Sequence, residues 1–176
     1  HPNFETKRIL FTGPTTEAQS FKEVVAAVAA IEGLTLTLVG KQPSPDSWEY
    51  GRMMLENRIE YLGWKNRVQL ASVISESTIG LITYNNNPIN MTNSPNKLFE
   101  FSAAGLPCVV TPTDSNRVWA AKSGGAVLAN GFNANDLAQA LRFATLDKEK
   151  WKLGGAKTAS AEQMREFLTQ QGLINK

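Results

Sequence analysis

The sequence predicts an α/β domain with a mostly parallel sheet and helices on both faces. Short apolar runs that end at glycine, proline or a polar loop alternate with stretches of helical periodicity along the whole chain. Such alternation is typical of parallel strands joined by right-handed helical crossovers. The length of 176 residues suits a single domain, and 42% hydrophobic with 19% charged residues is the composition of an ordinary globular protein.

Six apolar runs predict the strands. The first (KRILFTG) stops at a Gly-Pro pair, and the second (LTLTLVG) alternates and stops at a glycine. The predicted strands cover residues 7–13, 34–40, 59–63, 79–84, 107–112 and 126–129.

Apolar residues at helical spacing predict the helices between these strands. In 20–30, Phe21, Val24 and Val28 recur on one face, and Ser20 is a plausible N-cap. Asn133 or Asn135 is expected to cap a later helix. The predicted helices cover 20–30, 45–57, 65–75, 95–105, 116–122, 135–146 and, interrupted at Gly154-Gly155, about 148–176.

The charge balance and the cysteine count exclude several classes of function. Lys and Arg number 18 and Asp and Glu 16, so the net charge of +2 gives no reason to expect nucleic acid as a partner. No apolar run approaches the roughly 20 residues of a membrane span. The one cysteine, Cys108, is expected in the core and fits a reducing, cytoplasmic compartment. With one Cys and one terminal histidine, His1, we expect neither a metal site nor a bound cofactor.

The fold class predicts where a ligand binds. In open parallel sheets, ligands lie beyond the carboxyl ends of the strands, near a reversal in strand order. Of the predicted connections at that edge, residues 84–94 form the longest and most polar, and they lead directly into a helix start. Within this loop, Asn90 and Asn93 are candidates for ligand contacts because an amide both donates and accepts hydrogen bonds.

The helix that begins near Pro95 offers an anion site. Unpaired backbone N–H groups and a partial positive charge at a helix start suit a diphosphate. Lys97 in the first turn opposes the helix dipole, which makes sense if a phosphate comes to lie nearby. Glu100 shares a face with Lys97 and could accept hydrogen bonds from two ribose hydroxyls. The alternative is a solvated Lys97–Glu100 ion pair.

Residues 94–110 (SPNKLFEFSAAGLPCVV) resemble the signature of the family-four glycosyltransferases and their relatives with the GT-B fold, roughly P-x-K-x-F-E-Y-x-A-A-G-x-P-V-V. Weaker matches at 36–40, 59–63 and 79–84 follow the order of that family. The resemblance implies one Rossmann-like half of a GT-B fold. Residues 1–176 would be a single donor-binding domain, and the N-terminal acceptor domain would be absent.

The resemblance also implies an activity and a site. The activity would be transfer of a hexose from a nucleoside diphosphate sugar, with UDP as the default, to an alcohol acceptor without a metal. Glu100 would hold the ribose, the segment before it would contact phosphate and sugar, and Gly13 would let the first loop approach the phosphates. The implied donor-binding residues are Glu100, Lys97, Asn96, Ser94, Asn93, Thr92 and Gly13.

Two departures from the family pattern leave alternatives open. Thr92 stands where many members carry a Glu that contacts the hexose, and Pro14 and Gln19 stand where many carry an Arg and a Lys that neutralise the diphosphate. Either Lys97 and helix dipoles supply the charge, or activity is weak or lost. The alternatives are a non-catalytic sugar-nucleotide-binding or assembly module, and a 2-epimerase-like domain, which the lack of a carboxylate set disfavours. For Trp64, packing is favoured over contact with the base.

Overall fold

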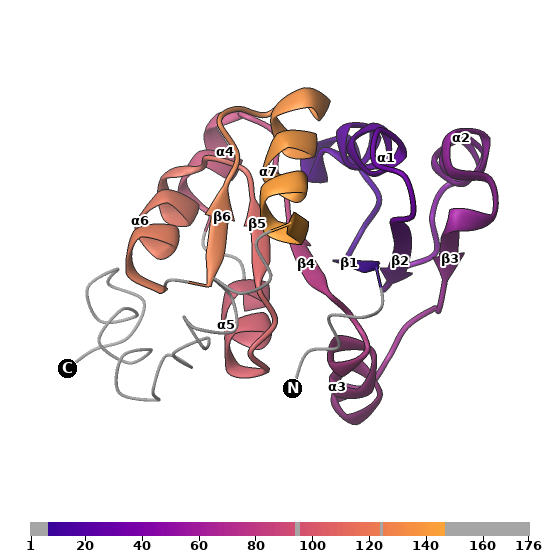
Figure 1. Cartoon of the computed structure of the whole chain (residues 1–176), viewed down its shortest axis with the longest axis horizontal. Helices are drawn as coiled ribbons and strands as arrows, with labels where there is room; N and C mark the ends of the chain where they lie inside the picture. Colours follow the sequence, from indigo (N-terminus) through magenta and orange to yellow (C-terminus); the bar gives the residue numbers. More distant parts are fainter. Residues whose placement is uncertain (1–6, 94–95, 124, 147–176) are drawn as a thin grey trace.

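The computed structural model describes residues 7–93, 96–123 and 125–146 (Figure 1). Six strands form one sheet in the order β3-β2-β1-β4-β5-β6, and every pair is parallel. The predicted α/β class is therefore confirmed. The strands are β1 (Arg8–Thr12), β2 (Thr35–Val39), β3 (Ile59–Tyr61), β4 (Ile79–Ile82), β5 (Cys108–Val110) and β6 (Ala126–Leu128).

The helices lie between consecutive strands, as the alternating pattern predicts, and one further helix follows the last strand. Ser94, Pro95 and the helix predicted over 148–176 fall outside the described residues. The described helices are α1 (Phe21–Ala29), α2 (Pro45–Leu55), α3 (Arg67–Ser75), α4 (Pro88–Thr92), α5 (Asn96–Ala103), α6 (Asp114–Ser123) and α7 (Ala134–Leu146), with short 3-10 turns η1 (Glu17–Gln19) and η2 (Glu56–Arg58).

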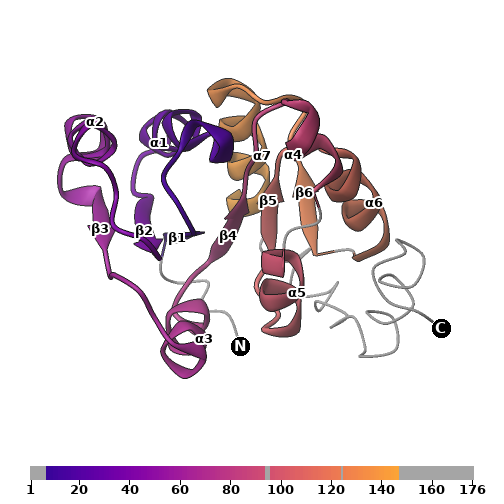
Figure 2. The ribbon, with the colours of Figure 1, turned by 180° about the vertical axis from the view of Figure 1, so that it is seen from behind.

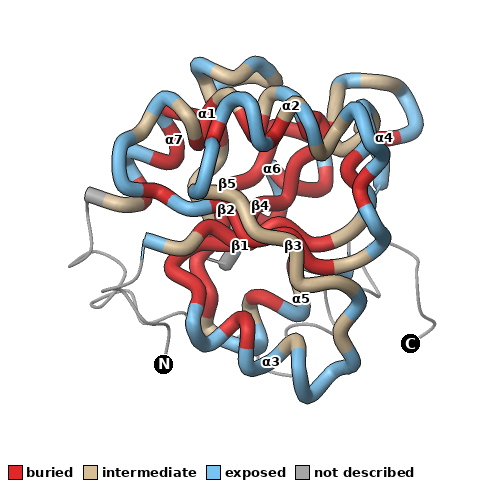
Figure 3. Tube along the Cα trace, turned by 90° about the vertical axis from the view of Figure 1, so that its right-hand side faces the viewer, coloured by how far each residue is buried: buried red, intermediate tan, exposed pale blue. Residues whose placement is uncertain are grey.

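The sheet separates two apolar cores. Ile9 and Phe11 of β1 pack in one core with α1 and α7, against which α2 also packs. Leu10, the residue between them, packs in the other core with α3, α5 and Trp119 of α6. Figures 1 and 2 show α1 and α2 on one side of the strands and α3 and α5 on the other, and Figure 3 shows the buried strands between these layers. Among the described helices, none has the length and hydrophobicity that crossing a membrane would need.

Some local predictions need correction. Ser20 stands at the N-cap of α1, but its side chain makes no capping bond and its backbone is left-handed, with φ 50°. Residues 85–93 are not only loop, because α4 forms within them, capped by the Asn87 side chain. Helix α6 begins at Asp114 and not at residue 116, since the Thr113 hydroxyl accepts from the Asn116 backbone in its first turn.

The strand order reverses between β1 and β4. The chain leaves β1 through α1 toward β2, and it leaves β4 through α4 and α5 toward β5 on the other side. The two connections diverge from the carboxyl ends of neighbouring strands, so they open a crevice at that point. The loop after β1 and the start of α5 are therefore the two segments that the fold brings to this crevice.

Candidate donor site at the carboxyl edge of the sheet

The first loop follows β1 directly and depends on two glycines. Gly13 has a φ of +110°, a conformation that side chains with a Cβ rarely adopt. Its N–H continues the sheet by donating to Val39 O at 2.8 Å. A Cβ on Gly40 would lie 3.1 Å from the nitrogen of Gly13, so the two glycines let the ends of β1 and β2 approach each other.

Hydrogen bonds fix the first loop to the loop after β4. Thr83 Oγ1 donates to Gln19 O at 2.6 Å, and the Asn85 N–H donates to Ala18 O at 3.1 Å. Asn90 Nδ2 donates to the same Ala18 carbonyl at 2.9 Å. On the opposite flank, Ser47 Oγ of α2 donates to the Thr15 carbonyl. The first loop is thus held from both sides before any ligand arrives.

The Lys97 amine lies against this first loop. Lys97 is the second residue of α5, and its Nζ donates to Gln19 Oε1 at 3.0 Å. A Cβ built on Gly13 would be 2.9 Å from the same Nζ, so the missing side chain leaves room for the amine. The structure therefore brings together Lys97 and Gly13, which are separated in the sequence and were predicted to share a site.

Aromatic rings and burial set the charge state of this amine. Its Nζ lies 5.5 Å from the ring centre of Phe11 and 6.0 Å from that of Tyr84. Burial lowers the pKa of Lys97 to about 8, and the charge of Glu100 opposes that shift. Burial also raises the pKa of the Tyr84 hydroxyl, while a hydrogen bond with the Gln19 side chain acts in the opposite direction.

The solvated ion pair between Lys97 and Glu100 is not what the structure contains. Arg8 forms ion pairs with Glu60 and Glu76, whereas the Lys97 amine turns to the first loop and donates to Gln19. Glu100 is exposed one turn further along α5. Among the residues that the structure describes, its carboxylate has no direct cation partner, and its exposure makes it accessible to a ligand.

The other predicted site residues lie on the same edge. Asn96 begins α5 and is exposed. Thr92 ends α4, and Asn93 follows it; both are exposed. Ser94 lies outside the described residues.

Three residues have roles that the sequence did not predict. Gln19 accepts a hydrogen bond from the Lys97 amine. In the sequence, Gln19 was notable only because it stands where a cation was expected from the resemblance. Asn90 is buried and donates to Ala18 O and to Asn85 Oδ1, so it joins the two loops and is not presented to a sugar. Trp64, for which packing was favoured, is instead 75% exposed beyond β3, and that prediction is wrong. The reason is that it follows Gly63, at φ +74°, outside the sheet.

Two buried side-chain oxygens of the described residues have no hydrogen-bond partner. Thr12 Oγ1 lies immediately before Gly13, and Asn116 Oδ1 lies in the first turn of α6. Asn116 also donates from Nδ2 to Thr111 O, and Thr111 Oγ1 accepts from the Tyr84 N–H. The β5–α6 connection is thus hydrogen-bonded to the residues that follow β4. Cys108 of β5 is buried, which confirms its predicted position in the core.

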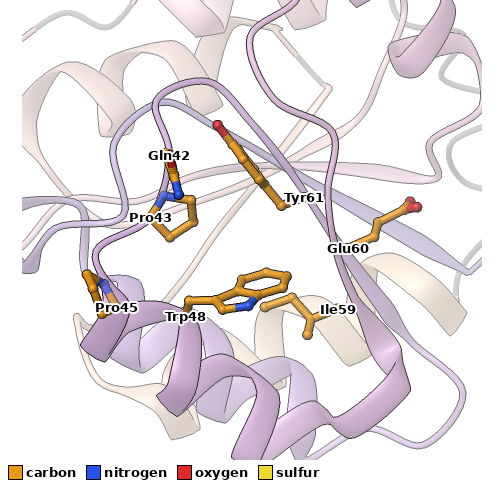
Figure 4. A pocket seen from close by; sticks show the side chains of 7 residues that line it. All are labelled: Gln42, Pro43, Pro45, Trp48, Ile59, Glu60 and Tyr61. Carbon is orange, nitrogen blue, oxygen red and sulfur yellow. The ribbon is translucent and has the colours of Figure 1, made fainter.

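A pocket of about 660 Å³ lies apart from these residues, between α2 and the edge strand β3 (Figure 4). The Trp48 and Tyr61 rings meet edge to face in it, with centres 6.5 Å apart, and Tyr61 Oη donates to Gly40 O. Its lining residues are Gln42, Pro43, Pro45, Trp48, Ile59, Glu60 and Tyr61. None of the predicted site residues lines it. Within the described ranges, no group of three His, Cys, Asp or Glu side chains could hold a metal ion.

Comparisons with known proteins bear on the family and the fold of this chain. The family model described as "Glycosyl transferases group 1" matches residues 6–147. No curated protein sequence matches the chain.

Three solved structures share the fold at low sequence identity. Sucrose-phosphate synthase from Thermosynechococcus elongatus aligns with a TM-score of 0.67 and 21% identity, covering 96% of this chain and 46% of its own. HepE from Anabaena, solved with UDP and glucose, aligns with a TM-score of 0.68 and 16% identity, and the alignment covers 94% of this chain and 48% of HepE. WaaG, a glycosyltransferase involved in lipopolysaccharide biosynthesis, aligns with a TM-score of 0.71 and 16% identity, and the alignment covers 97% of this chain and 48% of WaaG. The chain thus spans about half the length of these solved chains.

Proposed function

Because the chain belongs to the group 1 glycosyl transferase family and carries its half of a GT-B fold, we propose that it is the donor-binding domain of an enzyme that moves a hexose from a nucleoside diphosphate sugar to an alcohol acceptor. The donor binds at the carboxyl edge of β1 and β4. UDP is the proposed nucleotide, supported by the complex of the similar Anabaena HepE with UDP and glucose.

One observation carries this proposal. The Lys97 amine lies at the first loop, against Gly13, at the reversal of strand order. This is where an open α/β sheet binds its ligand, and the start of α5 adds backbone N–H groups and the positive end of a helix dipole. A half-buried cation beside a helix start and a bare glycine loop is suited to a diphosphate.

The remaining parts of the donor fall on neighbouring residues. Glu100, exposed one helical turn beyond Lys97, accepts hydrogen bonds from the ribose hydroxyls. We assign the exposed Trp64 ring, beyond β3, to the base of the nucleotide. The exposed Thr92 and Asn93 lie where the loop after β4 approaches the sugar.

In glycosyl transfer, the main role of this domain is to stabilise the charge on the leaving diphosphate. In glycosyl transfer the bond between the anomeric carbon and the β-phosphate oxygen breaks, and negative charge develops on the leaving diphosphate. The Lys97 ammonium and the α5 dipole stabilise that charge. The acceptor hydroxyl forms the new bond, and its proton passes to a base that we assign to the acceptor domain of the complete enzyme.

The position of Lys97 bears on the alternative of a non-catalytic binding module. That alternative rested on Thr92, which stands where a Glu was expected, and on Pro14 and Gln19, which stand where two cations of the first loop were expected. Lys97 brings an ammonium group to the same loop from α5, with Gln19 as its acceptor. The missing loop charge is thus supplied in part from the opposite wall of the crevice, which favours the transferase.

Titration calorimetry of the chain with UDP-glucose, GDP-mannose and dTDP-glucose tests the proposal. We expect one of these donors to bind with one-to-one stoichiometry. The affinity should be the same with EDTA and with magnesium, because the described residues hold no carboxylate cluster for a metal. Loss of binding in EDTA and its return with magnesium would contradict the metal-free site. Failure of every nucleoside diphosphate sugar to bind would contradict the function.

A further inference from the structure

The Gln19 side chain joins the two walls of the donor crevice. Its backbone carbonyl accepts from Thr83 Oγ1 at 2.6 Å, which anchors Gln19 to the residue that directly follows β4. Its side-chain oxygen accepts from Lys97 Nζ at 3.0 Å, and its side chain also hydrogen-bonds the Tyr84 hydroxyl. Gln19 is thus held at its backbone, and its side chain contacts both Lys97 and Tyr84.

The Lys97 amine has few other polar partners. Gly13 offers no side chain, and the Phe11 and Tyr84 rings offer only their π faces at 5.5 and 6.0 Å. Among the described residues, the titratable groups facing it are Glu100 on its own helix and Tyr84 after β4. From β1 and the first loop it meets Phe11, Gly13 and Gln19, none of which titrates. The Gln19 amide is thus its neutral hydrogen-bond acceptor.

We infer that Gln19 is a positioning residue, which holds the Lys97 amine at the first loop so that the donor diphosphate meets a cation already in place. The inference rests on the proposed function. It explains how an uncharged residue serves where relatives use a cation: the amide accepts a hydrogen bond from a lysine across the crevice without cancelling its charge, whereas a carboxylate would neutralise it.

This arrangement links donor binding to proton uptake. Burial lowers the pKa of Lys97 to about 8. A bound diphosphate favours the charged amine and raises that pKa, so binding takes up a proton at pH values near and above 8 and none well below it. The affinity therefore falls as the pH rises through 8.

Calorimetry with UDP-glucose in two buffers of different ionisation enthalpy, HEPES and Tris, measures this uptake. UDP-glucose is a suitable probe because its diphosphate has no group that titrates near pH 8. The wild-type chain should take up about half a proton at pH 8 and close to none at pH 6.5. Binding without any buffer dependence at pH 8 would overturn the inference while leaving the proposed function intact. Absence of binding at both pH values would remove both.

Two variants of opposite sign separate positioning from a structural role. Gln19→Met removes the acceptor, so the pKa of Lys97 in the donor-free protein falls. Proton uptake at pH 8 then increases toward one, and affinity drops more at pH 8 than at pH 6.5. Gln19→Glu pairs with the amine, so uptake at pH 8 disappears. Gln139→Met, on the exposed side of α7, is the matched control and should behave as wild type. Equal losses of affinity at both pH values, with uptake unchanged in both Gln19 variants, would show a merely structural role.

Discussion

Lys97 and Glu100 differ both in burial and in the part of the donor that each is proposed to bind. Lys97 is half buried and makes its hydrogen bond to the first loop, whereas Glu100 faces solvent on the same helix. A buried ammonium costs folding free energy, and such cost is retained where it serves binding. An exposed carboxylate costs nothing to the fold, so its effect should be visible in ligand binding alone.

Glu100→Gln tests that division. If the carboxylate accepts two ribose hydrogen bonds, the variant should weaken UDP-glucose binding by about 1.5–3 kcal/mol, the range for hydrogen bonds to a charged group. Calorimetry gives the affinity, and thermal unfolding should be unchanged because Glu100 is exposed. Glu49→Gln, an exposed carboxylate on α2, is the control. Equal affinities for the two variants would remove Glu100 from the site.

At the scale of the elements, the sequence predicted nearly all of the sheet. The strands were readable because each is a short apolar run with a glycine, proline or polar stop, and α3 was readable through its polar start, where Asn66 and Gln69 form a capping box. Helix α4 was not predictable, since it has five residues and its asparagines also favour turns. The capping residue, Asn87, is close in sequence, but α4 is also held by the hydrogen bond from Asn90 to the carbonyl of Ala18, which is distant in sequence.

The site was predictable only in part for a related reason. The motif places Lys97 and Glu100 on one helix, which spacing alone shows. The meeting of Lys97 with Gly13 and Gln19 depends on the strand order, which brings residues 78 positions apart to 3.0 Å. The exposure of Trp64 likewise depends on where β3 ends, and hydrophobicity gives no information on that.

The position of α5 depends on Gly80. A Cβ on Gly80 of β4 would lie 2.5 Å from the Phe101 ring, so the glycine lets α5 pack close to the sheet. Gly80→Ala should force Phe101 outward, cost about 1–3 kcal/mol of folding free energy and weaken UDP-glucose binding, because Lys97 and Glu100 move with the helix. Denaturant unfolding and calorimetry on the same variant measure the two effects.

Gly125→Ala is the control for this substitution. A Cβ at Gly125 would meet no atom within 4 Å, so both stability and affinity should stay near the wild-type values. If Gly80→Ala lowered stability without changing affinity, the position of α5 would not control the donor site.

At the scale of the whole molecule, the described donor site is open on the side of α5 and α4. Asn96, Glu100, Thr92 and Asn93 are all exposed, so water surrounds the place where the leaving diphosphate would develop charge. High dielectric weakens electrostatic stabilisation, and transfer also needs an acceptor and a base held near the anomeric carbon.

We therefore expect this chain to bind the donor without transferring its sugar. The chain is incubated with labelled UDP-glucose and a panel of alcohol acceptors, and calorimetry on the same sample shows that the donor binds. The label should remain in the nucleotide sugar. Transfer at rates of about 1 per second or more, typical of enzymes, would contradict the assignment of the acceptor site and base to a second domain.

The central claim is that the donor binds where β1 and β4 diverge, and nitrogen-15 NMR of the chain titrated with UDP-glucose tests it most directly. The indole N–H signals of Trp64 and Trp48 report on the proposed site and on the pocket beside β3, and single Trp→Phe variants assign them. We predict the largest shifts at the Gly13 and Glu100 amides and the Trp64 indole, with the Trp48 indole nearly unmoved. Largest shifts at Trp48 and Tyr61, with Gly13 and Glu100 unmoved, would contradict the account.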